Sequence, residues 1–205
     1  NDTITGNGNT RVEYRRSPGV TVDLDAGTAI DGFGGTDTLI GVNQVRSSES
    51  ADTLLGSTGT GFEQFRPRGG DDFIDGRGGT SDEVRYTGAK TGITIDLSTG
   101  ATVTFSDGFG GTDPITNIER LRGSAFRDNL TGDGNDNRLR GDGGDDTLFG
   151  NAGNDDLQGG SGDDFLDGGA GADSLFGGDG DDRIVFDAAD ATVDGGAGSD
   201  TLVVS

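Results

Sequence analysis

Residues 159–185 decide the fold of this chain, and they read GGSGDDFLD, GGAGADSLF and GGDGDDRIV in succession. Each nine-residue unit follows the pattern G-G-x-G-x-D-x-U-x, in which U is a large aliphatic residue. The aliphatic position recurs every nine residues from Leu130 to Leu202 without a slip. Two places before it stand Asp128, Asn137, Asp146, Asp155, Asp164, Asp173, Asp182, Ala191 and Asp200. Such regularity predicts stacked, nearly identical units rather than one thick hydrophobic core.

The charge of the chain argues against a compact globule that folds unaided. The 205 residues include 42 glycines and carry a net charge of −22. Residues 141–205 hold 16 acidic residues against the single basic residue Arg183, a net of −15. So much like charge beside so few apolar residues predicts an expanded coil, unless something neutralises the carboxylates.

Two missing residue types narrow the chemistry. The chain has no cysteine and no histidine, which excludes disulfides, thiolate or imidazole metal sites and a Ser-His-Asp triad. Carboxylate and carbonyl oxygens remain, and these are the ligands that Ca²⁺ prefers. The acidic charge disfavours nucleic acid as a partner, and no apolar run is long enough to span a membrane. Because the chain begins at Asn1 without a methionine, we expect a piece of a longer protein.

Over residues 123–205 the repeats resemble the RTX (repeats-in-toxin) family of secreted bacterial calcium-binding proteins. The resemblance implies an all-β, right-handed parallel β-roll, in which six residues of each unit form a turn and three form a short strand. In a strand such as Thr147-Leu148-Phe149 the middle side chain faces one way and its neighbours the other, so the aliphatic residues stack inside. Two units complete one coil, here called a rung, and equivalent aspartates on one edge lie two units apart.

In the family, each calcium ion lies between two neighbouring rungs of one edge. This resemblance implies ions between Asp146 and Asp164, Asp164 and Asp182, Asp182 and Asp200, and Asp155 and Asp173. Asp128/Asp146 and Asn137/Asp155 are weaker candidates, since Asn137 offers a neutral oxygen and the turn before Asp128 has lost most of its glycines. Backbone carbonyls of the turns complete the implied ligand set, at Gly141, Gly143, Gly150, Gly159, Gly160, Gly162, Gly168, Gly171, Gly177, Gly178, Gly180 and Gly195. Because Ala191 has no carboxylate, we predict that the site between Asp173 and Ala191 is missing or weak.

The N-terminal two-thirds repeat at a longer period. Residues 19–24 (GVTVDL) match residues 92–97 (GITIDL), and residues 32–37 (GFGGTD) match residues 108–113. The offset grows from 72 to 76, which predicts an insertion near Thr102–Ser106 in the second copy. If the copies are equivalent, Val22 and Ile95 should both be buried, as should Leu24 and Leu97.

Fragments of the nonapeptide survive inside these copies as D-x-U triplets, which begin at Asp37, Asp72, Asp82 and Asp113 and are further candidate metal ligands. We therefore predict that residues 1–122 form a widened β-roll of two degenerate long repeats, the second running to about residue 132. Residues 123–205 form the regular roll. A separate β-sandwich is the alternative for the N-terminal part.

Two other residue types have alternative roles. Phe33 and Phe109 lie within turns, where we expect them to cap the core rather than to stack on a ligand. Arginines cluster at residues 11–16 and 120–140. We expect them to pair with nearby carboxylates, although they could also hold an anionic polysaccharide.

Taken with the resemblance, these observations predict a calcium-binding module that is not an enzyme. It would fold on meeting extracellular Ca²⁺ and support type 1 secretion of a larger protein from a Gram-negative bacterium, to the medium or the cell surface. Nothing indicates an oligomer. The alternative is an adhesin segment that binds a surface or an anionic glycan. A polysaccharide epimerase or lyase is less favoured, because only Tyr14, Tyr86 and Lys90 could serve its chemistry.

Overall fold

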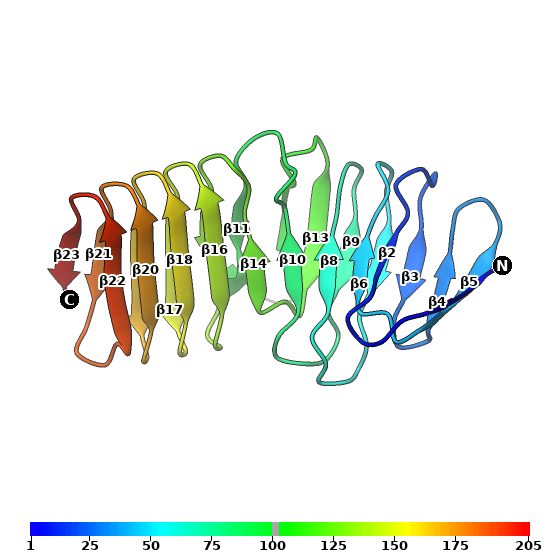
Figure 1. The fold of residues 1–205 in the computed structure, drawn as a ribbon, viewed down its shortest axis with the longest axis horizontal. Coiled ribbons are helices and arrows are strands. Elements are labelled where there is room, and N and C mark those ends of the chain that lie inside the picture. Colours follow the sequence, from blue (N-terminus) through cyan, green and yellow to red (C-terminus); the bar gives the residue numbers. More distant parts are fainter. Residues whose placement is uncertain (100–102) are drawn as a thin grey trace. The chain divides into compact units, whose positions relative to one another are not determined.

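The computed structural model describes residues 1–99 and 103–205, which are almost entirely short β-strands. One 3-10 helix, η1 (Leu97–Thr99), accompanies them. The chain forms two compact units (Figure 1). Unit 1 comprises Asn1–Tyr86 with Ala101–Ile118, and unit 2 comprises Thr87–Gly100 with Glu119–Ser205. No helix in the described residues is long and apolar enough to cross a membrane.

Unit 1 is a parallel β-solenoid with two sheet faces. One face follows the order β1 (Thr3–Thr5), β5 (Thr36–Ile40), β4 (Thr28–Ile30), β3 (Thr21–Asp23), β7 (Thr53–Leu55), β9 (Phe73–Asp75), β13 (Thr112–Thr116) and β12 (Val103–Ser106). The other runs through β2 (Arg11–Glu13), β6 (Gln44–Arg46), β8 (Gln64–Arg66) and β10 (Glu83–Arg85). The pairs β3–β4, β4–β5 and β12–β13 are antiparallel, so hairpins are inserted into parallel rungs.

The core of unit 1 is one residue wide. The central residues of its three-residue strands, such as Val45, Leu54, Phe65 and Ile74, are fully buried. Neighbouring rungs are joined in register, with Val45 beside Phe65 and Leu54 beside Ile74. A narrow stack of single apolar side chains suits a sequence with so few of them.

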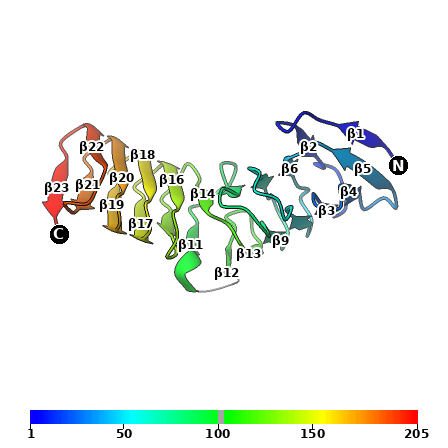
Figure 2. The same ribbon diagram turned by 90° about the horizontal axis from the view of Figure 1, so that it is seen from below.

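Unit 2 is a parallel solenoid of regular rungs (Figure 2). One face follows the order β14 (Arg120–Arg122), β16 (Arg138–Gly143), β18 (Asp156–Ser161), β20 (Ser174–Asp179) and β22 (Thr192–Ala197). The other follows β11 (Thr94–Asp96), β15 (Asn129–Thr131), β17 (Thr147–Ala152), β19 (Phe165–Ala170), β21 (Arg183–Phe186) and β23 (Thr201–Val204). From β15 on, paired residues are two nonapeptides apart, as in Leu130 with Leu148.

The predicted β-roll is confirmed, and two details differ. The aliphatic residues from Leu130 to Ile184 are fully buried, whereas Val193 is half-buried and Leu202 is 50% exposed. Each of the last two pairs with a neighbouring rung on one side only. The expected three-residue strand is also too short: strands such as β18 span six residues, because the glycine-rich start of each turn keeps pairing in register, as in Gly160 with Gly178.

The two long-repeat copies are built alike. Val22 pairs with Leu54 in one unit and Ile95 with Leu130 in the other, and both Val22 and Ile95 are buried as predicted. Leu97 is buried but Leu24 is only half-buried, so the second predicted pair holds for one member. Thr102, at the start of the predicted insertion, lies outside the described residues. The sandwich alternative is wrong for the described part of unit 1, because its rungs pair as a parallel solenoid.

Candidate calcium-binding ladders

The last aspartate of each regular turn is a link in a hydrogen-bonded ladder. Its Oδ1 accepts the backbone N–H of the equivalent residue on the preceding rung, eighteen residues earlier. On one edge the donors and acceptors are Asp128 to Asp146, Asp146 to Asp164, Asp164 to Asp182, and Asp182 to Asp200, at 2.7, 2.7, 2.8 and 3.1 Å. On the other edge they are Asn137 to Asp155 and Asp155 to Asp173, at 2.7 and 2.8 Å.

The second carboxylate oxygen of these residues has no donor. Within the described residues, Oδ2 is buried without a hydrogen-bond partner in Asp146, Asp155, Asp164, Asp173 and Asp182. A buried polar atom without a partner costs about 1–3 kcal/mol, and more when it is charged. Five such atoms at equivalent positions therefore indicate a missing partner that recurs with the repeat.

Glycines shape a cradle around each of these oxygens. A Cβ added to Gly141 would overlap Asp146 Oδ2, and one added to Gly159 would overlap Asp164 Oδ2. The same two added atoms would lie 2.7 Å from the carbonyl oxygens of Gly159 and Gly177 respectively, one rung further on. Only glycine leaves room for a carboxylate and a carbonyl to converge here.

The ionised form of these aspartates is unfavourable in the absence of a cation. Burial, and then nearby carboxylates, raise the pKa of Asp146 to about 8 and those of Asp155 and Asp164 to about 7, although the ladder hydrogen bonds act in the opposite direction. The same burial raises the pKa of Asp173 and Asp182. A divalent cation would remove this penalty.

The donor set fits a hard cation held largely by the backbone. In the described residues no three carboxylate side chains converge into a ready-made metal site. A cation between two rungs would therefore take one or two aspartate oxygens and complete its shell with turn carbonyls. Ca²⁺ accepts such mixed oxygen ligands in flexible geometry.

A family model described as "RTX calcium-binding nonapeptide repeat (4 copies)" matches residues 116–148, 149–184 and 187–202. The C-terminal part of this chain is an RTX calcium-binding repeat region. No curated protein matches the chain. The family match leaves the first 115 residues without an assignment of their own.

The ends of the RTX ladders differ from their middle. Asp128 already has partners for both oxygens, because Ser124 donates its backbone N–H to Oδ2 at 2.6 Å and its hydroxyl to Oδ1 at 2.9 Å. Asn137 accepts the N–H of Asp133 at 2.7 Å. The two positions that the sequence ranks as weaker ligands are thus the ones whose oxygens are already satisfied.

Beside Ala191 the ladder is completed by a different residue. Asp190 Oδ1 accepts the N–H of Asp173 at 3.3 Å, and its Oδ2 accepts the N–H of Asp187 at 2.7 Å. Both oxygens of Asp190 are therefore engaged, and the turn lacks the glycine cradle of its neighbours. A standard RTX site between Asp173 and Ala191 remains predicted to be absent or weak.

Two ladder positions of unit 1, Asp72 and Asp113, accept protein donors on both carboxylate oxygens. Asp72 Oδ1 accepts the N–H of Asp52 and Asp113 Oδ1 that of Asp72, at 2.9 and 3.0 Å. Their second oxygens accept hydroxyl groups, Ser47 on Asp72 at 3.3 Å and Tyr86 on Asp113 at 3.1 Å. These two residues therefore differ from the RTX aspartates, whose second oxygens have no donor in the described residues.

The other two candidates in unit 1 occupy the same kind of position. Asp37 Oδ1 accepts the N–H of Asp2 at 2.8 Å, and Asp82 Oδ1 accepts the N–H of Glu63 at 3.1 Å. Both side chains are buried. Whether either binds a metal stays a prediction.

Sequence reasoning missed the hydroxyl donors, although a signal was present. Ser48 and Ser124 stand four residues before Asp52 and Asp128, at matched positions of the two long copies. Ser48 donates its N–H and its hydroxyl to Asp52, as Ser124 does to Asp128. In regular turns such as the one before Asp164, this place is glycine. A serine there marks a ladder aspartate whose two oxygens both accept protein hydrogen bonds.

The aspartates that stand directly before ladder residues, at the fifth place of the turn, form a separate exposed row. Asp145 Oδ1 accepts the N–H of Asp163, and Asp163 Oδ1 accepts that of Asp181, at 3.2 and 2.9 Å. Arg127 also donates to Asp145 at 2.7 Å. These side chains are exposed, and they join neighbouring rungs.

Proposed function

We propose that the RTX region is a folding module that closes around Ca²⁺. The five buried, partnerless Oδ2 atoms carry this proposal, since their repulsion and desolvation oppose folding until a cation sits between the rungs. Binding free energy then becomes folding free energy. The candidate ions lie between Asp146 and Asp164, Asp164 and Asp182, Asp182 and Asp200, and Asp155 and Asp173.

The cellular setting follows from the same switch. Extracellular calcium modules bind with dissociation constants of about 10⁻⁴–10⁻³ M, far above cytosolic calcium. The region would stay unfolded inside a bacterium and fold outside it. We therefore propose export by a type 1 system of a Gram-negative bacterium, with the module guiding the folding of a larger protein. Its role is binding and folding rather than catalysis.

Far-ultraviolet circular dichroism tests the folding switch. In chelator the RTX region should contribute a coil signal while unit 1 keeps its β signal, and millimolar Ca²⁺ should add the β signal of the RTX region cooperatively. Mg²⁺ should substitute poorly, because it demands tighter octahedral geometry and loses water reluctantly. Identical, strongly β spectra with and without calcium would refute the proposal.

An arginine row on unit 1 favours a second candidate function, binding of an anionic glycan. Arg46 and Arg66 are paired neighbours on β6 and β8, and Arg85 holds the same place on β10. Adjacent strands are about 4.8 Å apart, so these guanidinium groups repel one another. Burial, and then neighbouring arginines, lower the pKa of Arg46 and Arg66. A linear polymer with a carboxylate on each sugar would relieve this repulsion.

Polygalacturonate binding measured across a salt series tests this second candidate. The double variant Arg46→Gln/Arg66→Gln should lose binding, whereas Arg127→Gln/Arg183→Gln in unit 2 removes the same charge and should retain it. Equal losses would indicate a diffuse charge effect rather than a site. No binding at low salt would exclude this candidate.

A further inference from the structure

Both long-repeat copies contain a tyrosine and an aspartate at matching positions, and only one of these two pairs is hydrogen-bonded. In the second copy the Tyr86 hydroxyl donates to Asp113 at 3.1 Å, and the whole tyrosine is buried. The matching residues of the first copy are Tyr14 and Asp37. The Tyr14 hydroxyl is buried yet has no hydrogen-bond partner in the described residues. The tyrosine hydroxyl of the first copy therefore lacks the hydrogen bond that the matching hydroxyl of the second copy makes.

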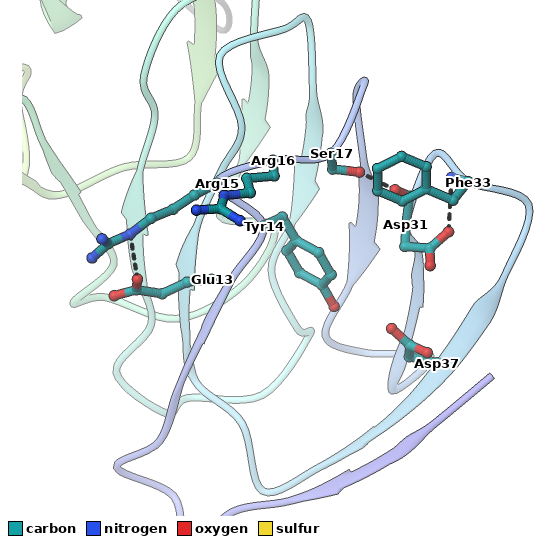
Figure 3. Close-up of a pocket in the computed structure, with 8 residues that line it drawn as sticks. All are labelled: Glu13, Tyr14, Arg15, Arg16, Ser17, Asp31, Phe33 and Asp37. Atoms are coloured by element: carbon teal, nitrogen blue, oxygen red, sulfur yellow. Dashed lines mark hydrogen bonds and ion pairs between the residues drawn. The ribbon is translucent and has the colours of Figure 1, made fainter.

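Tyr14 lines a pocket together with the turn that carries Asp31 and Phe33 (Figure 3). Asp31 Oδ1 accepts the N–H groups of Phe33 and Gly35, at 2.9 and 3.0 Å, and this fixes the turn that presents the phenyl ring. Asp107 holds the matching turn of the second copy through the N–H groups of residues 109–111. Phe33 is 73% exposed, so the expectation that it caps the core is wrong.

The charges around the Tyr14 hydroxyl define what could occupy the pocket. Figure 3 shows this hydroxyl and the carboxylates of Asp31 and Asp37 directed into one space beside the Phe33 ring. Burial, and then these two carboxylates, raise the pKa of Tyr14 to about 12, so the phenol stays protonated at neutral pH. An occupant must accept one hydrogen bond from the phenol, donate others to the carboxylates, and offer an apolar surface to the phenyl ring.

We propose that this pocket binds a pyranose ring. Neighbouring sugar hydroxyl groups both accept and donate hydrogen bonds, and the C–H face of the ring packs on an aromatic side chain. An apolar wall with a few converging polar groups is the usual composition of a small-molecule site. The raised pKa disfavours Tyr14 as a general base, which argues for binding rather than for the lyase chemistry considered from the sequence. The site lies in unit 1 and does not depend on the calcium ladders.

Saturation-transfer NMR with methyl glycosides of glucose, mannose and galactose tests the site in calcium-containing buffer. We expect transfer to the ring protons of at least one glycoside at millimolar concentration. Tyr14→Phe removes one hydrogen bond and should weaken binding about three- to tenfold. Phe33→Ala should abolish it, and because Phe33 is exposed the fold should survive.

The second copy supplies the matched control. Tyr86→Phe removes the hydroxyl that is already bonded to Asp113 and should leave the sugar affinity of the folded protein unchanged. The chain has two tyrosines and no tryptophan, so in this variant Tyr14 is the single strong fluorophore and its emission should change on sugar addition.

Three outcomes would overturn the proposal: no transfer to any of the three glycosides, unaltered binding by Tyr14→Phe, or a Tyr14 response to Ca²⁺ alone. The last would make the pocket a cation site.

Discussion

Two ladder positions in each unit use the same hydrogen bond and differ in how the second carboxylate oxygen is satisfied. In unit 1 the second oxygens of Asp72 and Asp113 accept hydroxyl groups from Ser47 and Tyr86. In unit 2 the equivalent oxygens of Asp146 and Asp164 are buried without a partner in the described structure. The same solenoid can thus be stabilised by side-chain donors or left to depend on a cation. If the proposed calcium sites form, calcium dependence is a property of individual rungs rather than of the fold.

The largest expected effect is selective unfolding when calcium is withdrawn. Hydrogen exchange measured by mass spectrometry in chelator should show loss of protection in β16–β22, while β6–β10 stay protected. Unit 2 then lacks the partner for its buried oxygens, whereas unit 1 retains its hydroxyl donors. Simultaneous loss of protection in both units would contradict the comparison.

The next effect concerns single aspartates of the RTX region. Asp164→Asn should raise the calcium concentration needed for folding by about tenfold or more, because Asp164 is shared by two proposed ions. It should also lower the stoichiometry measured by titration calorimetry. Asp190→Asn is the matched control, since both oxygens of Asp190 are engaged by backbone N–H groups. Equal effects of the two substitutions would show that the edge assignment is wrong.

A third, smaller effect is expected when a ladder aspartate of unit 1 loses its hydroxyl donor. Tyr86→Phe leaves Asp113 Oδ2 without its donor in a fully buried place, which should destabilise unit 1 by about 1–3 kcal/mol. Chemical denaturation in chelator measures this loss. Thr58→Ala removes an exposed hydroxyl of unit 1 that donates to Asp25 and should have little effect. If Tyr86→Phe were as stable as the parent, the hydroxyl would not be what replaces the cation.

The smallest effect is a pH response of the calcium-free RTX region. The pKa of Asp146 is raised to about 8 and that of Asp164 to about 7, against about 3.9 in an unfolded chain. The folded state therefore binds more protons, so acidification favours folding, and this contribution is lost as pH rises through 7 to 8. Calcium-free β signal should grow as pH falls from 8 to 5, and the calcium midpoint should rise. A calcium-free signal that declines over this range would contradict the assigned pKa directions.

Most of the fold could be predicted from the sequence because the packed core of the regular rungs requires an aliphatic residue at a fixed spacing. The stack from Leu130 to Ile184 needs an aliphatic residue every nine places, and the sequence shows it. The hairpins of unit 1 carry no such constraint: rung spacings there vary from 19 residues, between Glu63 and Asp82, to 41, between Asp72 and Asp113.

The candidate site was predictable to the level of the aspartates and not to the level of their second oxygens. Asp72 and Asp146 both stand in a D-x-U triplet, and nothing within the triplet separates them. The separation comes from Ser47, 25 residues before Asp72, which only the rung geometry brings into contact. The exposure of Phe33 likewise depends on how its turn leaves the solenoid.

The direction of the ladder bonds gives the RTX region a polarity along the chain. Each N–H on one rung is bonded by the carboxylate of the rung that follows it in sequence, as in Asp146 to Asp164. The N–H of a ladder residue therefore gains its acceptor only once the following rung has formed. Deleting rungs from the C-terminal end leaves the ladder N–H of the new last rung without its acceptor, whereas deleting rungs from the start leaves the ladder carboxylate of the new first rung without its donor. A run of rungs therefore needs a donor before its first ladder aspartate, which Ile93 supplies to Asp128, and an acceptor after its last ladder N–H.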